Sequence, residues 1–460
     1  MSDVLSKAAT VADIARAVSS GKAKASAVIE AALQRIAAVE PTVNAFTDIV
    51  ADRARKRAIE IDAGRHMGPL AGVPFAVKNL FDIEGLPTRA GSKINVDGPR
   101  AARDGALIRK LEAAGAILVG GLNMGEYAYD FTGENAHYGP SRNPHDPTCM
   151  TGGSSGGSGA AVAAGEVPLA LGSDTNGSIR VPSSLCGLFG LKPTYGRLSR
   201  AGSFPFVDAF DHLGPMARST LDLALSFDAM QGWDPDDPAC TDRLADLTVL
   251  GLDEGIGGLR VAIAGDYFAT GGEPEAFEAV ATVAKALNAT RTVVVPQAAA
   301  ARSAAYVITA IEGAQLHLPR LKTRPQDFDP DTRERFMAGA LLPGAWYVKA
   351  QRFRRQYRTH VLKLFEEVDI ILAPATPRSA PKIGQKMMTV GGVELPVRAN
   401  LGLYTQPISF IGLPVVAVPT RRPGRMPIGV QVIAKPYNEM AALRVSAYLE
   451  KQGVCVSAPA

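Results

Sequence analysis

The sequence predicts an α/β protein with a mixed, mostly parallel β-sheet covered by helices on both faces. Three observations support this prediction. Short apolar runs typical of buried strands alternate with helical patterns through the middle of the chain. A hydrophobic fraction of 47% and a charged fraction of 20% are ordinary for a globular protein. The 460 residues contain no internal repeat, low-complexity tract or flexible linker, so one continuous domain over 1–460 is the economical interpretation.

The spacing of apolar residues over about the first 65 positions predicts a helical N-terminal arm. Helices are expected at residues 10–20 and at 26–39, where Gly21 and Pro41 would end them. A third helix, near 50–63, carries many basic residues on its outer side. Such an arm is either a packing element or a surface for another protein chain, and the sequence favours neither.

A catalytic core is expected from about residue 66 to 220. It begins with a buried-strand pattern at 72–79 that ends on Lys78. Lysine is rarely fully buried, and the competing interpretation is a side chain that reaches from the strand end to solvent. Then come helices at 104–114, 122–130, 156–165 and 178–186, strands at 116–119, 167–171 and 188–191, and a long loop at 131–147.

The remainder of the chain continues the alternation, with an elaborated region at about 235–345. A helix at 221–230 leads into a Pro/Asp-rich loop. A βαβ unit is then expected from a strand at 259–264, a helix at 274–287 and a strand at 290–295. Further helices are expected at 301–317, 330–338, 345–365 and 438–452, strands at 369–373, 415–418 and 428–433, and a hairpin at 388–396.

Composition argues against several classes of function. The net charge of +4 is small and the basic residues are scattered, so nucleic-acid binding is not expected. The N-terminus has no apolar core for a signal peptide, and no apolar run reaches the ~18 residues of a membrane span. Four well-separated cysteines predict buried free thiols in a reducing cytoplasm. The histidines lack HxxxH spacing, so no metal site is expected.

The segment at 151–194 contains two small-residue turns separated by an apolar run. The first is Gly-Gly-Ser-Ser-Gly-Gly at 152–157, and the second ends at Ser178. A phosphate-binding loop would need GK[ST], and a dinucleotide fold GxGxxG, and neither is present. A hydrolase elbow would need a preceding strand and a downstream histidine in a recognisable context, which His212, His317 and His360 lack.

The remaining interpretation is a serine nucleophile activated by a lysine. Serine is a poor nucleophile without a base beside it. Lysine acts as that base only when it is neutral, which burial can achieve by lowering its pKa. Lys78 has the required setting, and a second serine could relay the proton.

These motifs resemble those of the amidase signature family. The resemblance is carried by Lys78, the turn at 152–157 and the run GSDTNGSIR at 172–180. It extends through GPSRNP at 139–144 and GLFGLKPTYG at 187–196, and it covers most of the chain. It implies a single amidase-signature domain and no metal or organic cofactor.

The resemblance also implies a Ser-cis-Ser-Lys triad. In this chain Ser178 would be the acylated nucleophile, Ser154 the bridging serine after a cis peptide bond with Gly153, and Lys78 the base. An amide carbonyl would be attacked, ammonia or an amine would leave, and water would resolve the acyl-enzyme.

The turn that carries the nucleophile would supply the oxyanion hole, from the backbone N–H groups of Thr175, Asn176, Gly177 and Ser178. Asp174 would orient this turn, and Arg180 would be structural.

Within the family, the run DTNGSIRVPSSLCG at 174–187 resembles the AtzE-type amidohydrolases of cyanuric acid degradation, which act on biuret and 1-carboxybiuret. Asn176 stands where most members have glycine or alanine, and the segments at 199–204 and 208–212 also match this group. The resemblance implies a small amide or ureide substrate, an oligomer, and a small helical partner similar to the C subunit of tRNA-dependent amidotransferases.

Two alternatives remain open. One is the A subunit of a glutamyl-tRNA or aspartyl-tRNA amidotransferase, a glutaminase, from whose usual pattern Asn176 and residues 181–184 depart. The other is a noncatalytic scaffold, against which the intact lysine and serines argue. For substrate contacts, Tyr129, Asp130 and Gln406 are candidates on the loops at 127–132 and 403–408, with ordinary loop packing as the competing interpretation.

Overall fold

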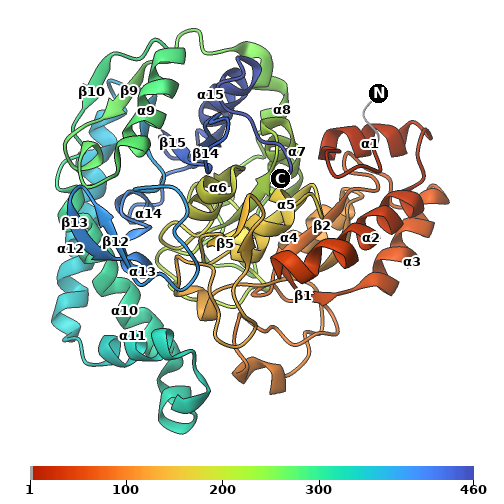
Figure 1. Ribbon diagram of the computed structural model, residues 1–460, viewed down its shortest axis with the longest axis horizontal. Coiled ribbons are helices and arrows are strands. Elements are labelled where there is room, and N and C mark those ends of the chain that lie inside the picture. Colours follow the sequence, from red (N-terminus) through yellow and green to blue (C-terminus); the bar gives the residue numbers. More distant parts are fainter. Residues whose placement is uncertain (1–3) are drawn as a thin grey trace.

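The computed structural model describes residues 4–460 and is built around one large mixed β-sheet (Figure 1). Across this sheet the strands run in the order β1 (Phe46–Ile49), β3 (Ile117–Leu122), β2 (Pro74–Lys78), β6 (Leu169–Ser173), β8 (Leu213–Ala217), β7 (Phe189–Lys192), β14 (Val415–Pro419), β15 (Gly429–Ala434), β11 (Ile370–Pro374), β9 (Val261–Ala264) and β10 (Arg291–Val293). Two further two-stranded sheets are β4 (Arg142–Asn143) with β5 (Asp146–Met150), and β12 (Met387–Val390) with β13 (Val393–Pro396).

Helices surround the sheet. They are α1 (Val11–Ser19), α2 (Ala25–Val43), α3 (Ala51–Asp62), α4 (Ala106–Ala113), α5 (Gly156–Ala163), α6 (Arg180–Cys186), α7 (Thr220–Met230), α8 (Thr248–Gly251), α9 (Pro274–Ala286), α10 (Ala298–Thr323), α11 (Pro330–Ala340), α12 (Gly344–Leu364), α13 (Val397–Asn400), α14 (Gln406–Ser409) and α15 (Glu439–Lys451). Two groups of helices pack on the sheet, α4 with α7 and α15 in one, and α5 with α6 in the other. The predicted α/β class is therefore confirmed.

The expectation that the sheet is mostly parallel is wrong. Six of the ten strand pairings in the large sheet are antiparallel and four are parallel. One reason is β8, a strand that the sequence analysis missed. The connection through α6 leaves β6 and β7 parallel but not adjacent, and β8 enters the space between them antiparallel to both.

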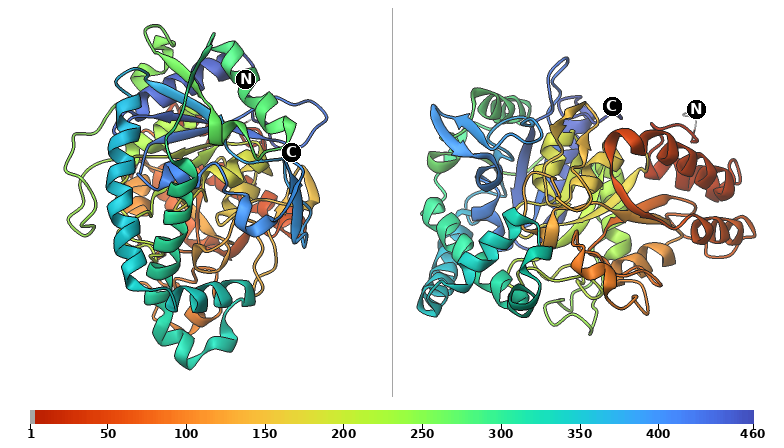
Figure 2. Two further views of the ribbon diagram at one scale, coloured as in Figure 1. Left: turned by 90° about the vertical axis from the view of Figure 1, so that its left-hand side faces the viewer. Right: turned by 60° about the horizontal axis from the view of Figure 1, so that its bottom comes forward.

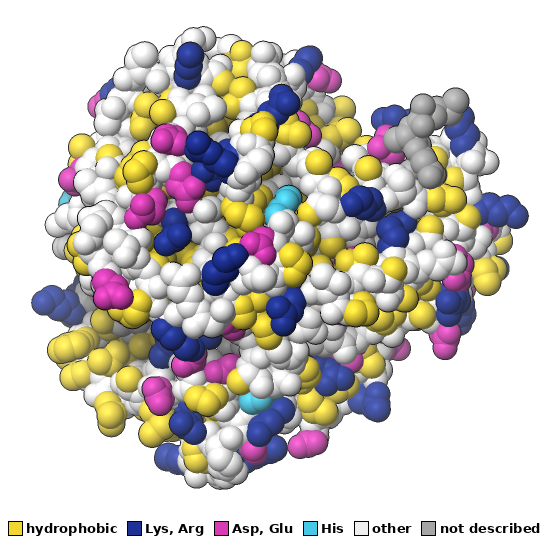
Figure 3. Space-filling model, in the orientation of Figure 1, with side chains coloured by type: hydrophobic (Ala, Val, Ile, Leu, Met, Phe, Trp, Pro, Cys, Tyr) yellow, Lys and Arg dark blue, Asp and Glu magenta, His cyan; other side chains and the backbone are white. Residues whose placement is uncertain are grey.

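The main hydrophobic core joins distant parts of the chain, because its cluster of buried side chains extends from Ala9 to Cys455, and a second, smaller cluster includes Phe131, Val181 and Val397. The N-terminal helices form one end of the molecule (Figure 2), where α2 and α3 pack on each other and β1 joins the sheet edge beside β3. On the visible face, acidic and basic side chains are interspersed (Figure 3). Within residues 4–460, none of the helices has the length and apolar character needed to cross a membrane.

Most predicted elements are present. They differ from the prediction in where a helix ends or how long it is, and local backbone conformation explains these differences. Pro41 does not end α2, which continues to Val43 and stops at Asn44 in the left-handed conformation (φ 52°). The helix expected at 122–130 is reduced to one 3₁₀ turn at Glu126–Ala128, in which Tyr127 and Ala128 have positive φ. The βαβ unit β9-α9-β10 and the hairpin β12-β13 are as expected.

Candidate active site

Strand β2 carries Lys78 into the interior. Its side chain is fully buried, and Nζ donates hydrogen bonds to Ser154 Oγ (2.7 Å) and Ser173 Oγ (2.8 Å). Burial lowers the pKa of Lys78 to about 7, against the opposing pull of the Asp211, Asp174 and Asp130 carboxylates. The interpretation of a lysine that reaches to solvent is therefore wrong, and a neutral amine is accessible near neutral pH.

The first small-residue turn holds Ser154 against this lysine. The peptide bond between Gly153 and Ser154 is cis, as the resemblance implied. Close packing requires glycine here, because a Cβ at Gly153 would lie 2.4 Å from Asp130 Oδ2 and one at Gly157 would lie 2.5 Å from the Ala45 carbonyl. Ser154 is fully buried, so its hydroxyl is a partner for the lysine and not a surface group.

The second turn follows β6 and is fixed by a buried ion pair. Asp174 Oδ2 accepts hydrogen bonds from the Ile179 backbone N–H (3.2 Å) and from Arg180 Nε (2.9 Å). Burial alone would raise the pKa of Asp174, but the Arg180 guanidinium holds it below its usual value. Arg180 is itself fully buried and also donates to the Thr405 carbonyl and Gln431. Its contacts are those of a structural residue that holds the turn.

Ser178 lies at the end of this turn and is 3% exposed. It lines a narrow cavity of about 10 Å³, roughly the space of one water molecule. The walls are Ala128, Tyr129, Asp130, Phe131, Thr175, Asn176, Phe206, Tyr306, Thr309, Arg335 and Gln406. The structure therefore brings Ser178 and all three predicted substrate contacts together. Among residues 4–460, no hydrogen bond joins Ser154 to Ser178.

Two of these contacts have partners within the protein. The Asp130 side chain is fully buried, and it accepts hydrogen bonds at Oδ1 from Arg398 (2.8 Å) and at Oδ2 from the Gly133 N–H (2.6 Å). Its carboxylate therefore holds the loop. Gln406 Oε1 accepts from Arg302 Nε (2.9 Å), which leaves the Gln406 NH₂ group free of partners in the described part of the chain.

Arg335 on α11 is a wall residue that the sequence analysis missed. Its guanidinium carbon lies 3.5 Å from the centroid of the Tyr129 ring, and Nη1 donates to the Tyr129 carbonyl (2.6 Å). No carboxylate within residues 4–460 pairs with it, although most other buried or half-buried arginines here have such a partner. Nothing local in the sequence marks this position, because α11 reaches the site through tertiary packing, mainly against α10.

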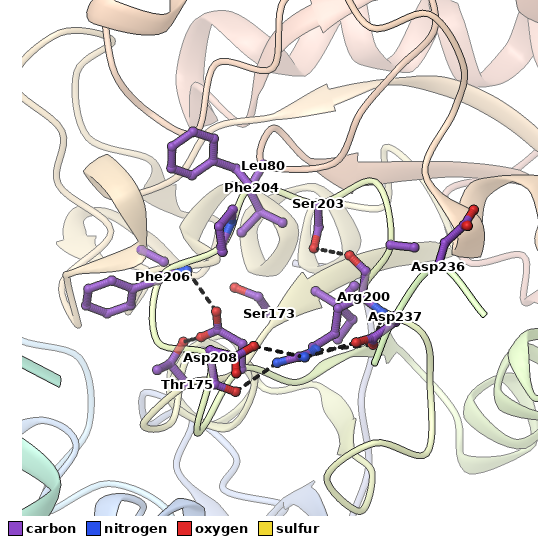
Figure 4. A pocket seen from close by; sticks show the side chains of 15 residues that line it. Leu80, Ser173, Thr175, Arg200, Ser203, Phe204, Phe206, Asp208, Asp236 and Asp237 are labelled. Carbon is purple, nitrogen blue, oxygen red and sulfur yellow. Dashed lines mark hydrogen bonds and ion pairs between the residues drawn. The ribbon is translucent and has the colours of Figure 1, made fainter. Parts of the chain in front are cut away.

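A second cavity, of about 150 Å³, also reaches this turn, at Thr175 (Figure 4). It reaches Ser173, the second partner of Lys78, and contains Arg200 paired with Asp237 (2.9 Å). Asp211 accepts a hydrogen bond from the Thr175 hydroxyl (2.6 Å), and burial raises the pKa of Asp211. The Thr175 turn is thus held between the two cavities. Within the described chain, no group of three or more His, Cys, Asp or Glu residues is arranged to hold a metal ion.

The Amidase family model matches residues 27–443. The chain belongs to the amidase family. It is an amidohydrolase that acts on C–N bonds, and the resemblance drawn from the motifs is confirmed.

Individual relatives agree with this assignment. The chain is 55% identical over 449 residues to the AtzE chain of 1-carboxybiuret hydrolase from Pseudomonas sp. strain ADP, covering 96% of this chain and 98% of the relative. It is 38% identical over 470 residues to the A subunit of glutamyl-tRNA(Gln) amidotransferase from Azotobacter vinelandii, covering 95% and 96%. A solved structure described as a vestigial protein complex that reveals the origins of an s-triazine catabolic enzyme matches with TM-score 0.96 and 53% identity, covering 97% and 99%.

Proposed function

We propose that this amidohydrolase cleaves a small ureide, 1-carboxybiuret or biuret, and releases ammonia. The similarity to the AtzE chain of a 1-carboxybiuret hydrolase over almost the whole length supports this substrate class. The small cavity beside Ser178 also favours a compact substrate. The alternative substrate is glutamine, on which the A subunit of a tRNA-dependent amidotransferase would act.

The proposed reaction uses Ser178, Ser154 and Lys78 as a triad. Neutral Lys78 takes a proton from Ser154, with which its Nζ shares a 2.7 Å hydrogen bond, while Ser154 takes the proton of Ser178. Ser178 Oγ attacks the carbonyl carbon, and the proton passes back through Ser154 to the leaving ammonia. Water then attacks the acyl-enzyme by the same route and releases the acid.

Oxyanion stabilisation in this proposal comes from backbone N–H groups of Thr175, Asn176, Gly177 and Ser178. The turn that carries them is held by Asp211 at one end and by Asp174 with Arg180 at the other. Donors fixed before the reaction need no reorganisation as charge develops on the substrate oxygen, which is why such a hole is effective.

The choice between these substrates rests on Arg335. It is a cation in the wall of the Ser178 cavity without a carboxylate partner in residues 4–460, so a substrate carboxylate can pair with it. Glutamine also needs an anion for its ammonium group. The carboxylate among the described wall residues is Asp130, which is fully buried and already engaged by Arg398. A ureide whose only charged group is one carboxylate therefore fits the wall better than an amino acid, which also carries an ammonium group.

An ammonia-release assay against 1-carboxybiuret, biuret, malonamate and glutamine tests the proposal. We expect turnover of the first two and little of glutamine. Arg335→Gln is expected to raise KM for 1-carboxybiuret about 30-fold, because a hydrogen-bonded ion pair is lost, with a small effect on uncharged biuret. Arg333→Gln, on the same helix outside the cavity, is the matched control. Hydrolysis of glutamine alone would favour the amidotransferase alternative.

We propose further that the chain works in an oligomer with a small helical partner. The similarity to a structure described as a vestigial protein complex supports this. Mild purification from the source cells, followed by light scattering and mass spectrometry, gives the assembly state and any small co-purified protein. The four cysteines are free and buried, which supports a reducing compartment such as the cytoplasm.

A further inference from the structure

Asn176 has a side chain that nothing in the reaction above uses. It is 7% exposed, and its Nδ2 donates a hydrogen bond to Thr309 Oγ1 (2.9 Å) on α10. Its Oδ1 is buried and has no hydrogen-bond partner in the described chain. Buried acceptors in folded proteins are nearly always paired, so an unpaired one beside a nucleophile indicates a ligand contact.

The direction of this oxygen is fixed by its surroundings. Thr309 holds the amide nitrogen from α10, and the Thr405 hydroxyl donates to the Asn176 carbonyl (2.6 Å) from the opposite side. The next residue, Gly177, has φ 144°, and a Cβ there would lie 2.2 Å from Thr405 Oγ1, so this position packs closely against Thr405 and requires glycine. Asn176 and Thr309 both line the cavity that contains Ser178. The unpaired acceptor therefore belongs to a residue that is held in place in the wall of the cavity that contains Ser178.

We propose that Asn176 Oδ1 accepts a hydrogen bond from a substrate N–H adjacent to the scissile carbonyl, and that it makes the site selective for ureides over simple carboxamides. This inference rests on the proposed function, in which Ser178 attacks that carbonyl. A ureide has N–H at the position where a carboxamide has CH₂. A methylene would leave the buried oxygen unpaired, and sites built around a buried polar group discriminate against ligands that cannot pair with it.

Thr309 is a positioning residue in this proposal. It touches the Asn176 amide, and its hydroxyl decides which way the Asn176 amide plane faces. The selectivity therefore depends on two segments 133 positions apart, the nucleophile turn and α10. Glycine or alanine at position 176 would supply the same backbone N–H without the acceptor.

The test compares two stable acids of equal length, N-carbamoylglycine (HOOC-CH₂-NH-CO-NH₂) and succinamate (HOOC-CH₂-CH₂-CO-NH₂). They differ in one NH group beside the scissile carbonyl. We measure kcat/KM for ammonia release from each and compare the ratio between protein variants, which cancels the lower intrinsic reactivity of the urea. Asn176→Ala is expected to lower the ratio of ureide to amide about ten-fold, the effect of one buried hydrogen bond.

Two variants of the positioning residue Thr309 complete the test. Thr309→Val is expected to lower the same ratio several-fold, whereas Thr309→Ser, which keeps the hydroxyl, retains it. An unchanged ratio in Asn176→Ala, with ammonia still released, would overturn this inference and leave the proposed function standing. Absence of ammonia release by the unmodified protein from both acids, from biuret and from 1-carboxybiuret would overturn both.

Discussion

Strands β2 and β7 each carry a fully buried lysine, and the two differ in what surrounds the amine. Burial lowers the pKa of both Lys78 and Lys192 to about 7. The Lys78 amine donates to two serine hydroxyls, whereas the Lys192 amine donates to the carbonyl of its own neighbour, Pro193 (3.1 Å). The Arg180 guanidinium further lowers the pKa of Lys192, and no such cation acts on Lys78.

Burial alone does not make a lysine a base. Both amines are accessible in the neutral form near pH 7, but a base needs a proton donor within hydrogen-bond reach. Ser154 provides that donor for Lys78. The carbonyl beside Lys192 can only accept, so the β7 lysine has no proton to take.

Ser178→Ala should have the largest effect, because it removes the nucleophile that the β2 lysine is proposed to activate. We expect ammonia release to fall by at least about 10⁴-fold, as for other nucleophile deletions. Steady-state kinetics with biuret measures this, and circular dichroism checks the fold. Retained turnover would mean that Ser178 is not the nucleophile.

Lys78→Met and Lys192→Met form a volume-matched pair that tests the comparison directly. Loss of the general base should lower kcat about 10³-fold in Lys78→Met. Since a methionine side chain has a volume similar to that of lysine, the unfolding midpoint of both variants should change little. A Lys78→Met protein with a normal rate at pH 7 would remove the base assignment.

The pH dependence should follow Lys78. Its folded pKa is lowered from the ordinary value of 10.5 to about 7, so the amine is protonated below that pH and cannot accept a proton. The rate should rise with pH up to about 7 and then level off, and at pH 5 it should be about 100-fold lower. A midpoint above pH 9 in a kcat/KM profile would contradict the lowered pKa.

Lys192→Met should have the smallest effect. We expect kcat within about three-fold of the unmodified protein and the same midpoint in the pH profile, because Lys192 contacts no reacting group. Between pH 7 and 10.5 the unfolded chain binds a proton at this lysine that the folded chain does not, so folding stability rises with pH in that window. Urea titrations should show a smaller rise in the variant. A large loss of activity would instead mean that both buried lysines serve the reaction.

Much of the fold could be predicted because its elements depend on local patterns. Buried strands such as β2 and β6 are short apolar runs, and the hairpin β12-β13 turns at two consecutive glycines, so neighbouring residues suffice to identify them. Strand β8 was missed because its sequence, Leu-Gly-Pro-Met-Ala, contains two residues that usually interrupt strands. Its antiparallel place between β6 and β7 depends on pairing along the whole strand, which no local pattern encodes.

By itself, the sequence predicted the chemistry that is proposed for this protein. Lys78, the Gly-Gly-Ser-Ser-Gly-Gly turn and Ser178 lie in short motifs whose turns need glycine for steric reasons, so the proposed reactive groups can be predicted from the residues around them. Only the tertiary structure decided what surrounds them. Arg335 and Thr309 reach the cavity through the packing of α11 and α10, more than 100 positions from Ser178 in the chain. Specificity depends on such distant contacts, because a cavity wall is assembled from whichever elements the core brings together.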